Sequence, residues 1–191
     1  LLKHIYSDVL WANPAREAQK WSLDDGIVVK RQTNPAEATL EAWGLVDGQP
    51  VGKHFSLLVF DDTVTRDSVN TPDQILKTTE SWEHAQFLSR STARIWHIGT
   101  RYNYADTYGQ IIERKAVKPR VYPATDDGAP DGKPVFLSEK EWNRIKRDSS
   151  NQTLACQMLQ NPIAGSEQEM KPEWLRKYEL RPRTLNIYIL G

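Results

Sequence analysis

Two short apolar runs stand out from an otherwise mixed pattern of hydrophobic and polar positions. Residues 57–60 (LLVF) are wholly apolar, and residues 93–100 (ARIWHIGT) form a second, mostly apolar run. A run such as LLVF is typical of a strand that is covered on both faces, as in a parallel sheet. Both runs are therefore predicted to be strands.

The segment between these runs predicts one capped helix. Thr71 suits the N-cap and Pro72 the first helical position, and apolar side chains then recur at helical spacing to about Ser89. Strand, helix and strand at this spacing indicate a right-handed crossover with two parallel strands, which end at Asp61 and Gly99. The predicted fold class is α/β.

The N-terminal segments predict shorter elements. Residues 1–20 carry apolar positions at helical spacing until Asn13-Pro14, so they predict one short helix that ends there. Residues 26–32 and 38–45 flank a Thr-Asn-Pro-Ala turn, which favours a β-hairpin ahead of the first apolar run.

The segments after the second apolar run predict a strand, a loop and two helices. Residues 117–124 (VKPRVYPA) are expected to form a strand, and residues 125–134 form a polar loop rich in turn residues. Ser138 and Glu141 are spaced as a capping box that opens a helix, and a further helix is expected over residues 152–159.

Composition narrows the class of protein without identifying it. The 191 residues include 25 Lys plus Arg and 25 Asp plus Glu, so the net charge neither supports nor excludes a nucleic-acid partner. Cys156 is the only cysteine, which excludes an intrachain disulfide, and the four histidines lack metal-ligand spacing. No run approaches the roughly 18 apolar residues of a membrane helix, so a soluble globular protein is expected.

Polar residues follow both predicted strands where each one ends. Because ligands of a parallel sheet bind at the carboxyl ends of its strands, we expect Asp61 and Asp62 to share a crevice with Gly99, Thr100 and Arg101. Two adjacent acids after a buried strand suit nucleotide hydrolysis: one holds Mg²⁺ and the other orients or deprotonates water. We assign Asp61 the metal role and Asp62 the role of the base.

Simpler interpretations exist for both motifs. The Asp-Asp pair by itself is also typical of a surface turn. The segment 99–112 (GTRYNYADTYGQII) could be a loop between a strand and a helix, with packed aromatic side chains and a solvated Arg101.

Six short motifs follow one another along nearly the whole chain: WSLDDGIVVKR, ATLEAWGL, GKHFSLLVFDD, GTRYNYADTYG, QMLQNP and LNIYILG. Their order and spacing resemble those of terminase large subunits, the ATP-driven motors that pump viral DNA into procapsids. The most specific part of this resemblance is the GTRY motif joined to an upstream Asp-Asp pair.

The resemblance implies a partial P-loop NTPase sheet of the RecA-like type, with ATP and Mg²⁺ as cofactors. The LVFDD run resembles a Walker B strand, in which Asp61 would bind Mg²⁺ and Asp62 would take the place of the catalytic carboxylate, where many relatives carry Glu. Gly99, Thr100 and Arg101 resemble the coupling motif, which senses the γ-phosphate and passes hydrolysis on to movement.

The resemblance also implies domain boundaries and partners. Residues 1–135 would belong to the ATPase domain, residues 136–183 to a helical linker, and residues 184–191 to the first strand of a nuclease domain whose acids are not in this sequence. The implied partners are double-stranded DNA, the portal protein, the procapsid, the terminase small subunit and further copies of the motor. The implied location is the host cytoplasm, with transient attachment to the procapsid.

The sequence contains no phosphate-binding loop. Gly52-Lys53 is the nearest candidate, but Asp47 stands in place of the first glycine and His54 in place of the Ser or Thr. In the family this loop lies upstream of the region of Trp21, so we expect the chain to be a fragment that is inactive alone. A helicase-like ATPase fragment and a non-catalytic viral assembly or DNA-binding adaptor are the alternatives.

Overall fold

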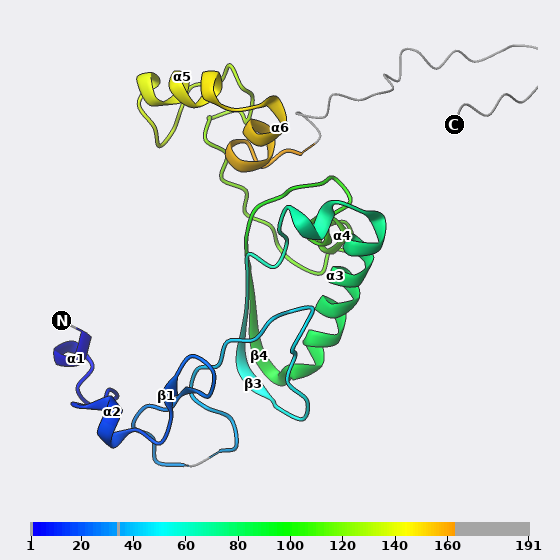
Figure 1. Cartoon of the computed structure of the whole chain (residues 1–191). Coiled ribbons are helices and arrows are strands. Elements are labelled where there is room, and N and C mark those ends of the chain that lie inside the picture. The colour runs from blue at the N-terminus through cyan, green and yellow to red at the C-terminus, as the bar shows by residue number, and fades with distance from the viewer. Residues whose placement is uncertain (1, 34, 163–191) are drawn as a thin grey trace, which may run out of the picture.

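The computed structural model describes residues 2–33 and 35–162. At its centre two parallel strands lie side by side, and a helix connects them along one face of the pair (Figure 1). These elements are β3 (Phe55–Asp61), α3 (Pro72–Ala85) and β4 (Ser89–Ile98). The predicted α/β class and the parallel pairing of the two apolar runs are confirmed.

The register of the two strands brings their carboxyl ends level. Leu57 pairs with Arg94 and Asp61 pairs with Ile98, and one irregularity follows Phe55 at the start of β3. The short 3-10 helix η1 (Asp67–Val69) lies between β3 and α3. Residues that follow Asp61 and Ile98 therefore leave the sheet at the same edge.

Helix α3 begins where the sequence predicts. Thr71 and Gln74 form a reciprocal capping box: the Gln74 amide donates to the Thr71 hydroxyl at 3.2 Å, and the Thr71 amide donates to the Gln74 side-chain oxygen at 3.1 Å. The helix ends at Ala85 and tightens into the 3-10 helix η2 (Gln86–Leu88), after which β4 begins.

One face of the β3–β4 pair is packed and the other is open. The packed face belongs to a core cluster formed by Phe60, Val64, Trp82, Ala85, Tyr108 and Ile111. On the strands, the exposed apolar side chains alternate with the packed ones, and they are Leu57, Val59, Trp96 and Ile98. We predicted a strand covered on both faces, but the described residues cover only one.

The N-terminal region differs from the predicted single helix and hairpin. It contains α1 (Leu2–Ile5), α2 (Pro14–Glu17), β1 (Trp21–Ser22) and β2 (Gly26–Ile27). The prediction that Asn13-Pro14 ends a helix is wrong, because Pro14 occupies the first helical position of α2, where a missing N–H costs nothing.

The predicted pairing of residues 26–32 with 38–45 shrinks to one antiparallel bridge between Ile27 and Leu40. Beyond that bridge, side chains replace the partners that a strand ladder would supply. The Val29 amide donates to the Thr39 hydroxyl at 3.2 Å, and the Arg31 guanidinium donates to the Glu37 carbonyl at 2.9 Å. Within the described N-terminal residues, the strands that pair as a hairpin are β1 and β2.

With one exception, the elements predicted within residues 99–162 form, and one helix that was not predicted, α4 (Thr107–Glu113), is also present. The predicted helices are α5 (Glu139–Asp148) and the pair of α6 (Asn151–Thr153) and the π-helical turn η3 (Leu154–Met158). The capping box of Ser138 and Glu141 opens α5 as predicted. A second apolar cluster of Ala124, Trp142, Leu154 and Leu159 packs α5 against η3, whereas α4 belongs to the first cluster through Tyr108 and Ile111.

The exception is the strand predicted over residues 117–124, which does not form. Pro119 and Pro123 lack the N–H groups that a strand ladder requires. The polar loop that follows is closed by a single bridge between Thr125 and Pro134. The strand predicted at 184–191 lies outside the described residues.

Candidate functional site

The parallel pairing brings the predicted site residues to one edge of the sheet. Asp61 is the last residue of β3 and lies opposite Ile98, and the Asp62 amide donates to the Ile98 carbonyl at 2.9 Å. Gly99 and Thr100 continue directly from Ile98. The predicted shared edge is therefore present, and the roles assigned to its residues stay predictions.

The two acids of this edge differ in backbone conformation. Asp61 is extended, whereas Asp62 has a φ of 44°, in the left-handed region that Asp tolerates better than most residues. Both side chains are exposed, and neither carboxylate makes a hydrogen bond or ion pair with another described residue. Two unpaired carboxylates on either side of a sharp turn are free to bind a cation or a water molecule.

The described residues supply only part of a metal site. In residues 2–33 and 35–162, no group of three or more His, Cys, Asp and Glu side chains is placed to hold a metal ion. Mg²⁺ fits such a sparse site better than most metals, because it usually keeps several water ligands and takes one or two carboxylates together with substrate phosphates. The donor set of Asp61 and Asp62 is compatible with that chemistry.

The loop after Thr100 is organised around a buried carboxylate that the sequence analysis did not assign. Asp106 has no exposed surface and accepts four hydrogen bonds. Its donors are Arg101 Nε at 2.7 Å and the amides of Tyr102 at 2.9 Å, Asn103 at 3.1 Å and Gly109 at 2.8 Å. Asp106 is also the N-cap of α4, so it fixes the loop and the start of that helix together.

The Arg101 side chain holds the loop in place through an ion pair and two further hydrogen bonds. Besides the ion pair with Asp106, its Nη2 donates to the carbonyls of Asn103 at 3.1 Å and Tyr104 at 3.0 Å. The interpretation of Arg101 as a solvated side chain is therefore wrong. Its guanidinium orders the loop that begins at Thr100.

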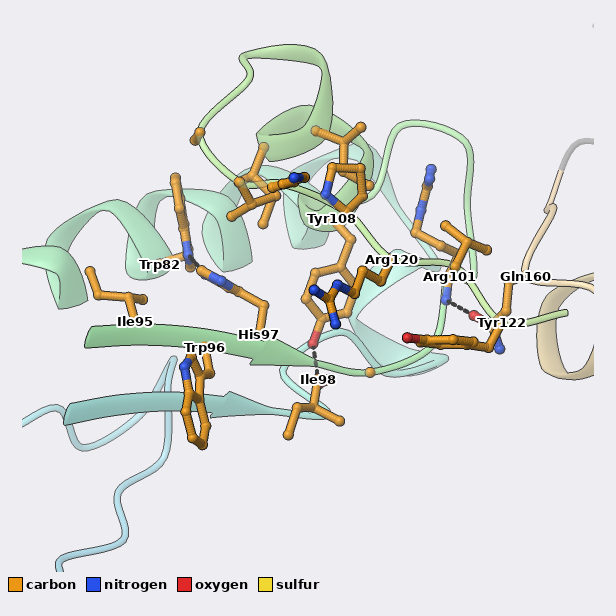
Figure 2. Close-up of a pocket in the computed structure, with 18 of the residues that line it drawn as sticks. Trp82, Ile95, Trp96, His97, Ile98, Arg101, Tyr108, Arg120, Tyr122 and Gln160 are labelled. Carbon is orange, nitrogen blue, oxygen red and sulfur yellow. Dashed lines mark hydrogen bonds between the residues drawn. The ribbon is translucent and has the colours of Figure 1, made fainter.

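Tyr108 joins the ends of both strands beneath the same loop. Its hydroxyl donates to the Ile98 carbonyl at 2.9 Å (Figure 2). The same hydroxyl lies 3.1 Å from the Thr63 hydroxyl. A Cβ at position 99 would collide with the Tyr108 ring, so glycine is required there. Burial raises the pKa of the Tyr108 phenol, which keeps it a neutral donor.

His97 is half-buried beside the core and acts as a hydrogen-bond acceptor there. Its ring stacks on Phe60 with centroids 4.8 Å apart, and its Nε2 accepts a hydrogen bond from Trp82 Nε1 at 2.9 Å. Burial lowers the pKa of His97 below its usual value of 6.5. A protonated ring could not accept the Trp82 hydrogen bond.

This geometry predicts a loss of stability in mild acid. The unfolded chain takes up a proton at His97 near pH 6.5, whereas the folded chain resists it, so the free energy of unfolding is highest above pH 6.5 and falls below it. Urea unfolding at pH 7.5 and 5.5 measures the difference. His97→Gln, which keeps a hydrogen-bond acceptor but does not titrate, should flatten it. The exposed His84→Gln is the control, and equal pH dependence in both variants would contradict the assignment.

Comparison of the chain with protein-family models, with curated proteins and with solved structures gave no match. None of the helices in the described ranges has the length and apolar character needed to cross a membrane.

Proposed function

We propose that this chain carries the hydrolytic edge of a Mg²⁺-dependent ATPase motor of the terminase large-subunit type, which drives DNA into a procapsid. The observation that supports it is the parallel β3–β4 pair, whose shared edge holds Asp61 and Asp62 beside Gly99 and Thr100. Parallel sheets bind ligands at this edge. The proposal places the phosphate-binding loop outside these 191 residues and makes the β3–β4 pair part of a larger RecA-like sheet.

Each acid then has one task. Asp61, at the extended end of β3, would hold Mg²⁺, which neutralises phosphate charge when bound. Asp62, whose own backbone is left-handed, would orient the attacking water or accept its proton. Asp is one methylene shorter than the Glu that many terminases carry at this place. The left-handed backbone at Asp62 would therefore determine whether its carboxylate can contact the attacking water.

The loop that starts at Thr100 would couple hydrolysis to movement. Thr100 would sense the γ-phosphate, and the Arg101–Asp106 pair connects its loop rigidly to the first turn of α4. From there the Thr107 hydroxyl lies 2.9 Å from that of Thr79 on α3, in the buried interior. A displacement of Thr100 would therefore be transmitted through these contacts to α4 and α3.

The proposal includes the partners and location of such a motor. These are double-stranded DNA, the portal protein, the procapsid, the terminase small subunit and further copies of the motor. The motor would work in the host cytoplasm and attach to the procapsid only during packaging.

Asp61→Asn tests the metal role in a parent protein that joins this chain to a phosphate-binding loop. We expect Mg²⁺-dependent ATP binding to weaken roughly tenfold or more, because the amide removes a charged metal ligand. Binding measured in EDTA should not change. Asp67→Asn, an exposed acid on η1, is the matched control. Equal Mg²⁺ dependence in both variants would favour the adaptor interpretation over the ATPase.

A further inference from the structure

A groove of about 1190 Å³ runs along the edge of β4 that has no strand partner in the described part of the chain. Five consecutive residues, 95–99, form one side, and the segment 116–122 forms the other. Figure 2 shows Trp96 and His97 pointing to opposite faces of β4, and Arg120 and Tyr122 near its carboxyl end. Gly99 and Arg101 line this groove, whereas Asp61, Asp62 and Thr100 do not, so the groove adjoins the proposed hydrolytic edge without including its two acids.

The charged side chains that line the groove are all positive. Arg101, Lys118 and Arg120 line it, and no Asp or Glu is among the described residues that do so. Arg101 is paired with Asp106, whereas Lys118 and Arg120 are exposed and form no ion pair with a described residue. In a chain with zero net charge, this local excess of cations favours an anionic ligand.

The groove also presents flat aromatic surfaces. The Trp96 side chain is 53% exposed and the Tyr122 side chain 67% exposed. Pro119, between the two free cations, restricts the backbone that carries them. Unpaired cations and accessible rings on the same groove match a ligand that carries both phosphates and planar bases.

We propose that this groove binds single-stranded nucleic acid, with Lys118 and Arg120 on phosphates and Trp96 and Tyr122 stacked on bases. A duplex hides its base faces, so it could use the cations but not the rings. An acidic peptide would satisfy the cations and leave the rings without planar partners. The proposed contacts leave out Asp61, Asp62 and Thr100, so variants of Lys118, Arg120 and Tyr122 test this groove without changing the proposed hydrolytic residues.

The test is fluorescence anisotropy with a labelled oligothymidylate of about 12 nucleotides, within the roughly 4 to 16 that single-strand sites cover. Lys118→Glu combined with Arg120→Glu should weaken binding by about tenfold or more. The slope of log affinity against log salt should fall by about 1.4, since each single-strand phosphate contact contributes about 0.7. Tyr122→Leu, which keeps apolar bulk without an aromatic face, should also weaken binding.

Lys20→Glu combined with Lys140→Glu makes the same charge change at two exposed sites outside the groove, and this control should bind like the parent. Circular dichroism checks that each variant is folded. Three results would overturn the proposal: equal binding of the oligothymidylate by the two double variants, a loss of duplex binding in the Lys118 and Arg120 variant as large as its loss of single-strand binding, or equal competition by polyglutamate of matched charge.

Discussion

Asp62→Asn is expected to lower ATP turnover of the parent protein by about 10²- to 10⁴-fold while Mg·ATP binding is kept. The amide has the shape of the carboxylate and tolerates the left-handed backbone at φ 44°, but it cannot accept a proton. The measurements are steady-state hydrolysis and nucleotide binding on one preparation.

Asp62→Glu is the matched variant, because it retains the carboxylate and adds the methylene that many terminases carry at this place. It should keep a substantial part of the turnover. Hydrolysis by Asp62→Asn at the parent rate would contradict the base assignment. Asp67 would then be the next candidate, because Asp106 is fully buried and all of its hydrogen bonds hold the loop.

Asp106→Ala is expected to cost about 3 to 5 kcal/mol in the free energy of unfolding, the usual range for removing one partner of a buried ion pair. The substitution leaves the Arg101 guanidinium without its charge partner and removes the acceptor of three backbone amides. Urea unfolding measures the loss, and hydrogen exchange at Tyr102 and Asn103 should report the freed amides.

Asp106→Asn should lose less stability, because its amide oxygen still accepts backbone hydrogen bonds while the charge for Arg101 is gone. Asp67→Ala, at an exposed acid on η1, is the control and should change the unfolding free energy by less than about 1 kcal/mol. A loss at Asp106→Ala no larger than at Asp67→Ala would show that the loop does not depend on this carboxylate.

The elements that could be predicted from the sequence depend on local signals. Thr71, Pro72 and Gln74 define the start of α3 within four residues, and the short crossover makes parallel pairing of β3 and β4 the expected topology. The predicted hairpin of residues 26–32 and 38–45 was wrong, because side chains there replace backbone hydrogen-bond partners. The Val29 amide donates to the Thr39 hydroxyl instead of to a carbonyl of the opposite strand.

The sequence predicted that Asp61, Asp62 and Thr100 lie at one edge of the sheet, and the parallel pairing of β3 and β4 places them there. The sequence analysis did not predict the hydrogen bonds that hold the adjoining loop. The buried role of Asp106 had one local signal, an Asp directly before the helical run TYGQIIE, which is typical of an N-cap. The hydrogen bond between Trp82 and His97 and the bond from Tyr108 to Ile98 depend on tertiary packing, which no local pattern specifies.

The most direct test of the central claim is a crystal structure of the parent protein with Mg²⁺ and a non-hydrolysable ATP analogue. We expect Mg²⁺ bound to the Asp61 carboxylate, at about 2.1 Å or through one water, with Asp62 on the water that faces the γ-phosphate and Thr100 beside that phosphate. Nucleotide and metal bound away from the edge of Asp61, Asp62 and Thr100 would contradict it.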